Sequence, residues 1–448
     1  MGGMGGATKG DGMRRSKVLV LAAVLVMVAV AVACAGEDGG GGGGGADRSE
    51  DTGKINILNA LSAEEGEALQ ALIDEMITPK VDYQVEIEAS EQFEEQFQIR
   101  AESGTLDLIL LPQPGALQDK ADSALSMEDL GFDIAALEDT FGSYYMSLGE
   151  IDGEHYGFPT NASYKSMVWY PKDDFDAAGY TVPTSWDELI ALSDQIVADG
   201  GTPWCVGFES GTATGWPATD WMEEIILKTG GVDVYQQWAT HEIPFTDPAV
   251  VSAGEMFGQI MFTDGYVLGG ADQTVAIPFG DAPAPMFQDP PGCWLHHQAT
   301  FISAFFPEDA KSGVDYDWFP FPAIETSDVL FAGELAVAFD NRAEIVDFLE
   351  RFSSEEVQCA MAGDPALGRL SPNVNVGADC YANPILGDAS AILAEALANG
   401  TAGFDAGDQM PAQVGSGSYW TGMVEYMQGG PQSLEGVLQE IDASWPEA

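Results

Sequence analysis

Residues 55–111 alternate between two hydrophobic periods, and this alternation constrains the fold more than any other feature of the sequence. Segments with the two-residue period of a strand alternate with segments whose apolar side chains recur at helical spacing. The order along the chain is strand 55–60, helix 64–77, strand 84–88, helix 93–101 and strand 106–111. This order predicts a parallel sheet with helices packed on it, which places the chain in the α/β class.

A second α/β region is expected after residue 163. Residues 167–170 form a short predicted strand, and Ser185 with Glu188 makes a capping box that opens a helix ending near Ala198. Other predicted elements are the amphipathic helix 219–229, two helices within 418–445 split by Gly429-Gly430-Pro431, and loops at 278–292 and 364–377. A chain of 448 residues exceeds what one hydrophobic core usually serves, so two domains are expected.

The N-terminus has the composition of an export signal. A basic stretch, 13–17, precedes sixteen apolar residues, 18–33, and small residues follow them. Sixteen residues are fewer than the roughly 20 that cross a bilayer comfortably. We therefore expect 1–33 to be a cleaved signal peptide, with an uncleaved signal anchor as the alternative.

The segment Ala31-Val32-Ala33-Cys34 resembles the lipobox of bacterial lipoproteins, although Leu is usual where Ala31 stands. The resemblance implies that Cys34 becomes the mature N-terminus and carries diacylglycerol, whose chains anchor it in the membrane. Residues 34–53 would then form a Gly-rich, acidic tether. The expected location is the extracellular face of the cell membrane, with the lipid anchor as the only membrane contact.

Four cysteines remain once Cys34 is set aside, and an exported protein can pair them. Four cysteines allow three connectivities. We favour Cys205–Cys293 and Cys359–Cys380, because each pair then lies within one local region; free, buried thiols are the alternative. No Cys-x-x-Cys motif is present, so neither a zinc ribbon nor thioredoxin chemistry is indicated.

The charge balance excludes whole classes of partner. The chain has 72 Asp and Glu against 16 Lys and Arg, a formal net charge of −56. Phosphate recognition needs a basic surface, so no nucleic-acid partner is expected, and docking on anionic lipid by charge is equally disfavoured. The chain is nevertheless expected to fold, since 46% of its residues are hydrophobic.

Segments spread over nearly the whole mature chain resemble extracellular solute-binding proteins of sugar ABC importers, in particular those that bind α-glucosides. The matching segments are 93–115, 166–189, 201–225, 279–302 and 404–427, of which YPKDDFDAAGYTVPTSWDEL within 166–189 is the most specific. The resemblance implies the maltose-binding-like fold of two α/β lobes joined by a hinge, with the ligand in the cleft between them. It implies lobe 1 at 54–162 plus 331–362 and lobe 2 at 163–330 plus 363–448.

A sugar site needs aromatic rings for the apolar faces of the ligand and planar polar groups for its hydroxyls. Trp216, Trp294 and the pair Tyr419-Trp420 lie near Gly, Pro or acidic residues rather than inside a helical stripe. The alternative for each is a core residue or a loop plug. Position in the sequence indicates four polar candidates. They are Glu64 and Glu65 after the first strand, Gln113 after the strand 106–111, and Asp220 near Trp216.

The family resemblance adds four further candidate ligand-binding residues, namely Tyr164, Glu334, Asp405 and Asp408. For every acidic candidate the alternative is a solvated surface position, because acidic residues are abundant in this chain. The four His show no metal-binding spacing, and phosphate-loop, dinucleotide and nucleophile-elbow motifs are absent from the sequence, so we expect no metal and no cofactor.

The favoured function is therefore the substrate-binding component of an ABC importer, a monomer that captures a neutral α-glucoside-type sugar and delivers it to the membrane subunits of a permease. This reading predicts no enzymatic activity. Two alternatives stay open: a secreted glycoside hydrolase that uses a pair of carboxylates, and a binder of a non-sugar solute.

Overall fold

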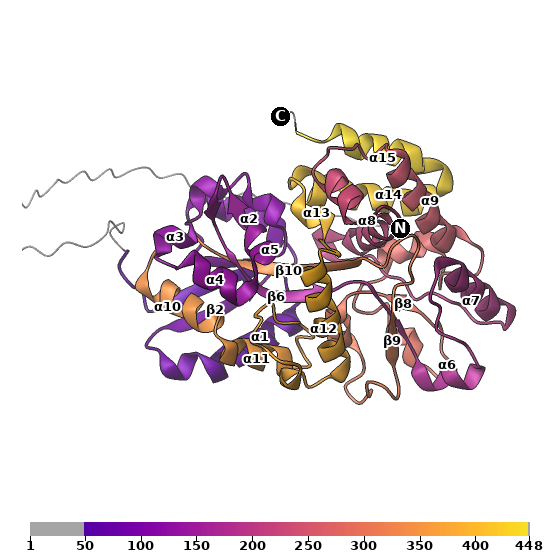
Figure 1. Ribbon diagram of the computed structural model, residues 1–448, viewed down its shortest axis with the longest axis horizontal. Helices are drawn as coiled ribbons and strands as arrows, with labels where there is room; N and C mark the ends of the chain where they lie inside the picture. Colours follow the sequence, from indigo (N-terminus) through magenta and orange to yellow (C-terminus); the bar gives the residue numbers. More distant parts are fainter. Residues whose placement is uncertain (1–48, 447–448) are drawn as a thin grey trace, which may run out of the picture. The chain divides into compact units, whose positions relative to one another are not determined.

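The computed structural model describes residues 49–446, which are built around a six-stranded mixed sheet with the path β11-β10-β3-β1-β2 (Figure 1). Strands β1 (Lys54–Asn59), β2 (Gln84–Ala89) and β3 (Leu108–Leu111) are parallel, as predicted. The predicted signal peptide, Cys34 and most of the tether lie outside the described residues.

The two helices that connect these strands cover opposite faces of the sheet. Helix α1 (Ala63–Met76) begins at a complete capping box, in which Ser62 and Glu65 bond each other's backbone N–H. Its buried face joins the core that contains Ile55 and Ile57. Helix α2 (Phe93–Ser103) packs with the alternate residues of the same strands, such as Leu58. Successive side chains of a strand point to opposite faces of the sheet, so alternate residues of β1 contact different helices. The predicted βαβαβ order is confirmed.

Strand β10 (Val329–Ala338) joins the two halves of the molecule. Its last residues pair with β3, its first residues pair with β11 (Ala402–Phe404), and β6 (Phe158–Tyr164) runs antiparallel beside its middle (Figure 1). The two strands approach closely at Gly333, where a Cβ would lie 2.4 Å from a backbone oxygen of β6. Two neighbouring strands therefore connect the halves.

The second half combines a small sheet with a helical core. Strand β7 (Met167–Tyr170) lies between β8 (His296–His297) and β9 (Asp317–Pro320), both antiparallel to it. Helix α7 (Trp186–Ala198) starts at Ser185 as predicted; Glu188, however, returns its bond to the N–H of Thr184 rather than to that of Ser185. Helices α9 (Pro248–Phe262), α14 (Trp420–Gly429) and α15 (Leu434–Ala443) complete this core, and the last two confirm the predicted helices of the tail.

Helix α8 (Trp216–Ala239) corrects the prediction of an amphipathic helix at 219–229. It is longer, interrupted at Gly231 with φ 71°, and buried on all sides from Pro217 to Lys228. Four charged residues of this helix are inside the protein, namely Asp220, Glu223, Glu224 and Lys228. A helix at the centre of a helical core has no solvent face, so its charges must find partners inside.

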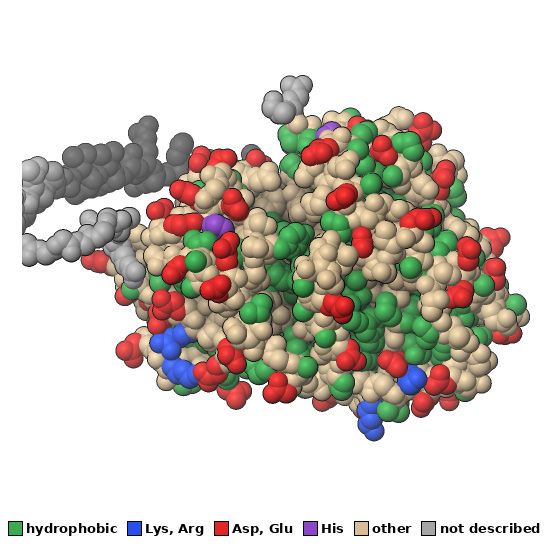
Figure 2. All heavy atoms as spheres, viewed as in Figure 1, with side chains coloured by type: hydrophobic (Ala, Val, Ile, Leu, Met, Phe, Trp, Pro, Cys, Tyr) green, Lys and Arg blue, Asp and Glu red, His purple; other side chains and the backbone are tan. Residues whose placement is uncertain are grey.

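Both favoured disulfides are present, Cys205–Cys293 with a Cα–Cα distance of 5.4 Å and Cys359–Cys380 with 5.1 Å. Figure 2 shows carboxylates distributed over the visible face and few Lys or Arg, in keeping with the charge balance. Within 49–446 no helix is long and apolar enough to cross a membrane. The remaining α-helices and β-strands are α3 (Met127–Leu130), α4 (Ile134–Phe141), α5 (Ser143–Ser147), β4 (Glu150–Ile151), β5 (Glu154–His155), α6 (Lys172–Ala178), α10 (Ala343–Phe352), α11 (Glu355–Gly363), α12 (Pro384–Asn399) and α13 (Ala406–Gln409).

Candidate functional site

A cavity of about 310 Å³ lies where the two halves face each other. One wall is formed by the residues that follow β1, β2 and β3, because the carboxyl ends of parallel strands meet at one edge of the sheet. The middle of the cavity is lined by β6 and β10, and the opposite wall by the start of α8 and by α13. The lining includes Ser62, Glu65, Glu94, Gln113, Asn161, Lys165, Trp216, Phe279, Phe301, Glu334, Arg369, Asp405, Asp408 and Trp420.

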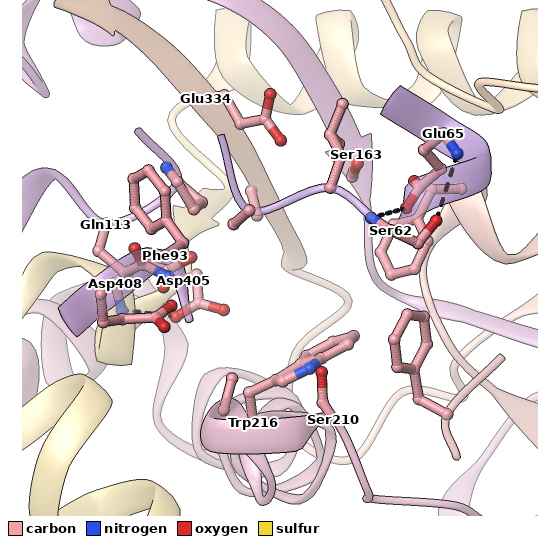
Figure 3. A pocket seen from close by; sticks show the side chains of 18 of the residues that line it. Ser62, Glu65, Phe93, Gln113, Ser163, Ser210, Trp216, Glu334, Asp405 and Asp408 are labelled. Atoms are coloured by element: carbon pink, nitrogen blue, oxygen red, sulfur yellow. Dashed lines mark hydrogen bonds between the residues drawn. The ribbon is translucent and has the colours of Figure 1, made fainter. Parts of the chain in front are cut away.

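Seven of the twelve predicted ligand-binding residues line this cavity. They are Glu65, Gln113, Trp216, Glu334, Asp405, Asp408 and Trp420. Figure 3 shows Glu65 on one side, Gln113 with both aspartates on the other side, and Trp216 between them. They contribute two of the aromatic rings and five of the polar side chains of the lining, whose other polar groups, such as Lys165 and Arg369, were not predicted.

The other five predicted residues do not line it. Glu64 is exposed on α1, whereas Tyr164 and Tyr419 are fully buried in the core. Trp294 packs edge-on against Tyr180, 5.1 Å between ring centres. Asp220 lies directly behind the wall, where it is the ion-pair partner of a lining residue, Lys165.

The apolar surface of the cavity centres on Trp216. This residue opens α8 after Gly215, whose φ of 114° and close approach to a backbone oxygen of Trp420 leave no room for a side chain there. Phe279 lies 5.2 Å and Phe301 6.0 Å from Trp216, measured between ring centres. The three rings form an aromatic surface of the kind that the apolar face of a sugar ring packs against.

One polar end of the cavity is organised by Arg369, a residue that the sequence did not single out. Its guanidinium bonds Glu65 at 2.8 Å, lies 4.0 Å from Glu334, and stands 4.9 Å above the ring of Phe301. The amide N–H of Asn161 donates to Glu334 at 2.7 Å. Burial raises the pKa of Glu334, against the opposing effects of Arg369 and Asn161. The Asn161 Oδ1 is buried and accepts no hydrogen bond from any described residue.

The other polar end is organised by Lys165, which the sequence analysis also did not identify. Its Nζ bonds Asp220 at 2.7 Å and Asp405 at 2.5 Å, and lies 5.6 Å from the centre of the Trp216 ring. Burial raises the pKa of Asp220 to about 7, although Lys165 acts against this rise. Burial opposes the positive charge of Lys165 itself, yet the carboxylates around it keep its pKa well above the ordinary value. Asp405 also caps α13 by accepting the N–H of Asp408.

Comparison with known proteins identifies the family. The family model of the bacterial extracellular solute-binding proteins matches residues 59–358. The chain belongs to this family. It is 38% identical over 398 residues, 85% of this chain and 84% of the relative, to the alpha-glucosides-binding periplasmic protein AglE of Rhizobium meliloti (strain 1021). It is 36% identical over 405 residues, 89% of this chain and 93% of the relative, to the osmoprotective compounds-binding protein GgtB of Synechocystis sp..

Solved structures of solute-binding proteins share the fold. The solute receptor AcbH superposes with a TM-score of 0.73 at 19% identity, covering 87% of this chain and 97% of that one. The maltose-bound MalE3 of T. maritima gives 0.67 at 15% identity, covering 87% and 98%. The expected two-lobed, maltose-binding-like fold is thereby confirmed. The family and the two relatives confirm the solute-binding component of an ABC transporter. The curated relatives AglE and GgtB are binding proteins by name, which points to binding rather than catalysis for this member of the family.

Proposed function

We propose that this solute-binding protein captures a neutral α-glucoside-type sugar in the cavity. The observation that carries the proposal is the arrangement of Trp216, Phe279 and Phe301 between two polar ends in which each cation is already paired with carboxylates. A neutral ring can pack on the aromatic surface while its hydroxyls donate to carboxylate oxygens that remain open. The 38% identity to AglE, named for α-glucosides, supports the same class of solute.

Capture is proposed to close the cleft between lobe 1 (54–162 plus 331–362) and lobe 2 (163–330 plus 363–448) by rotation about β6 and β10. The closed monomer then presents both lobes to the membrane subunits of its permease, while lipidated Cys34 holds it at the extracellular face of the membrane. Support for closure comes from a contact across the cavity mouth, where the hydroxyl of Thr212 donates to the backbone oxygen of Glu91 at 2.7 Å.

A second candidate solute is a non-sugar osmoprotectant. The name of GgtB, which refers to osmoprotective compounds, favours an osmoprotectant, since that relative is 36% identical over most of both chains. The two candidates share the requirement for a solute without net charge. They differ in the number of hydroxyl donors, so a panel of solutes separates them.

The test is isothermal titration of the purified protein against maltose, trehalose, sucrose and glycine betaine. We expect at least one sugar to bind and to be recovered intact, and we expect Trp216→Ala to weaken its affinity at least tenfold, because the ring is the centre of the aromatic surface. Trp294→Ala is the matched control, since it removes the same side chain from a site away from the cavity. Binding of betaine alone would favour the second candidate. Release of glucose would indicate a hydrolase, and equal affinities of the two variants would refute the stacking role.

A further inference from the structure

The two aspartates that line the cavity, Asp405 and Asp408, come from one short turn of the chain. This turn follows β11 and places both carboxyls on the side of the cavity that also holds Gln113 (Figure 3). Asp405 divides its carboxylate between two partners, since Oδ1 accepts the N–H of Asp408 at 2.8 Å and Oδ2 accepts Lys165 Nζ at 2.5 Å. The position of this turn therefore sets where two acceptor groups of the cavity wall lie.

The two residues between the aspartates are held from behind by Glu223 of α8. Its Oε2 accepts the backbone N–H of Ala406 at 2.9 Å, and its Oε1 accepts that of Gly407 at 3.2 Å. The first N–H groups of a helix have no partner within the helix, and a side-chain oxygen can accept them. Because Glu223 takes these two N–H groups, Asp405 caps only the third and keeps Oδ2 for Lys165.

The phenol of Tyr235 completes this support. Its hydroxyl donates to the backbone oxygen of Phe404 at 2.9 Å and accepts the N–H of Ala406 at 2.8 Å. The same oxygen lies 3.1 Å from Glu223 Oε2. Glu223 and Tyr235 are both fully buried on α8, and neither lines the cavity. The turn is thus fixed by two side chains that a solute in the cavity does not reach.

We infer that Glu223 is a positioning residue for solute binding, which acts through Asp405 and Asp408. The inference rests on the proposed function, since it names what keeps two acceptors in place for the hydroxyls of a sugar. Groups that contact a solute keep their geometry only where their neighbours hold them. Without the carboxyl of Glu223, the buried N–H of Gly407 loses its partner, so the turn shifts toward another acceptor and both aspartates move with it.

The first measurement needs no solute. Amide hydrogen exchange of the solute-free protein, followed by mass spectrometry, should be at least about tenfold faster at residues 405–409 in Glu223→Leu than in the wild type. Glu223→Gln keeps an amide oxygen for one of the two N–H groups, so its exchange should lie between those of the leucine variant and the wild type. Tyr235→Phe leaves Ala406 bonded to Glu223, and this milder variant decides the question if Glu223→Leu does not fold.

The second measurement titrates the same variants with the tightest-binding sugar of the panel. Loss of a buried hydrogen bond behind the wall should raise the Kd of Glu223→Leu by about tenfold. The Kd of Tyr235→Phe should rise less, because one acceptor remains for the N–H of Ala406. Glu223→Gln should recover part of the affinity that Glu223→Leu loses, and this graded recovery distinguishes positioning from a general loss of stability.

Each variant has a control of the same chemistry. Glu344 is also buried and accepts two successive backbone N–H groups, those of Thr52 and Gly53 at 3.0 Å each, yet it does not line the cavity. Tyr426 is also buried in the helical core, where its hydroxyl donates to the backbone oxygen of Gly254 at 3.0 Å. Glu344→Leu and Tyr426→Phe should lower the thermal midpoint and leave both Kd and the exchange of the turn unchanged.

The two measurements separate this inference from the proposed function. Exchange of the turn at the wild-type rate in both Glu223→Leu and Tyr235→Phe would overturn the positioning role, whether or not a sugar binds. Faster exchange, with no sugar bound by the wild type, would uphold Glu223 as the support of the turn and refute the proposed function. Faster exchange with an unchanged Kd, or a Kd raised equally by Glu344→Leu, would overturn the role of Glu223 in binding.

Discussion

Gly115 lies in the turn Pro114–Leu117, where the chain that leaves β3 meets α13 across the cavity. A Cβ at this position would stand 2.0 Å from the carbonyl oxygen of Met410 and 2.5 Å from that of Gln409. Both oxygens belong to the backbone, so no rotamer change relieves the contact. Gly115→Ala therefore requires the two segments to move apart until the first distance exceeds 3.0 Å, the lower limit of real Cβ contacts.

A two-lobed fold can relieve this clash by a small separation of its lobes. If the lobes rotate about β6 and β10 as proposed, the cleft opens and the turn separates from α13 without a change in either core. A methyl group forced into a packed contact costs about 1–3 kcal/mol. If that cost falls on the closed state, the solute affinity decreases by about 5- to 150-fold, while the stability of the solute-free protein stays the same.

Isothermal titration and thermal unfolding of Gly115→Ala measure these two effects separately. Gly436→Ala is the control, because nothing lies within 4 Å of a Cβ at that position on α15. An unchanged Kd would refute the reasoning that solute binding needs this close approach. A lower thermal midpoint without solute, at unchanged Kd, would show that the contact belongs to the resting fold rather than to closure.

Two further predictions concern the buried charges. Lys165→Met leaves Asp220 and Asp405 buried without their cation, so it should lower the free energy of unfolding by about 3–5 kcal/mol in urea titrations at neutral pH; a loss below 1 kcal/mol would contradict the buried ion pair. Burial lowers the pKa of His296 to about 4 and that of His297 to about 3, so the unfolded chain binds protons below about pH 6.5 that the folded chain does not. Stability should be complete above that pH and fall toward pH 4, by about 3 kcal/mol for His296 alone, and His296→Gln should reduce this acid sensitivity in pH-dependent unfolding.

The local parts of the fold were predictable because their signals lie in neighbouring residues. The strand and helix periods between 55 and 111 are set by burial on a single sheet, and Ser185 marks the start of α7 because a serine side chain satisfies a free backbone N–H. Strand β10 carries no such information, since its partners β3 and β11 are distant in sequence and pair with opposite ends of it. The burial of Glu223 and Glu224 on α8 was equally invisible, because acidic residues normally indicate a solvent face.

The residues of the candidate site were likewise predictable only where neighbouring residues carry the signal. Glu65 and Gln113 were found because they follow strands whose carboxyl ends meet at one edge of the sheet. Tyr419 and Trp420 share one sequence context, yet the first is in the core and the second lines the cavity, because adjacent residues of a helix point in different directions. Arg369 stands in a predicted loop and Lys165 beside the start of β7, positions where no periodicity marks a side chain as pointing inward.

The two cations support the proposal of a solute without charge. Each pairs with carboxylates and stands over an aromatic ring, Lys165 over Trp216 and Arg369 over Phe301, so both polar ends are held in place before a solute arrives. A carboxylate has about four lone-pair sites, and one ion pair leaves several of them open to hydroxyl donors. A cationic solute would compete with Lys165 and Arg369 for the same oxygens, and an anionic solute would meet the excess of carboxylates in the lining. The internal ion pairs therefore convert an acidic cavity into a surface of oriented hydrogen-bond acceptors around an aromatic centre.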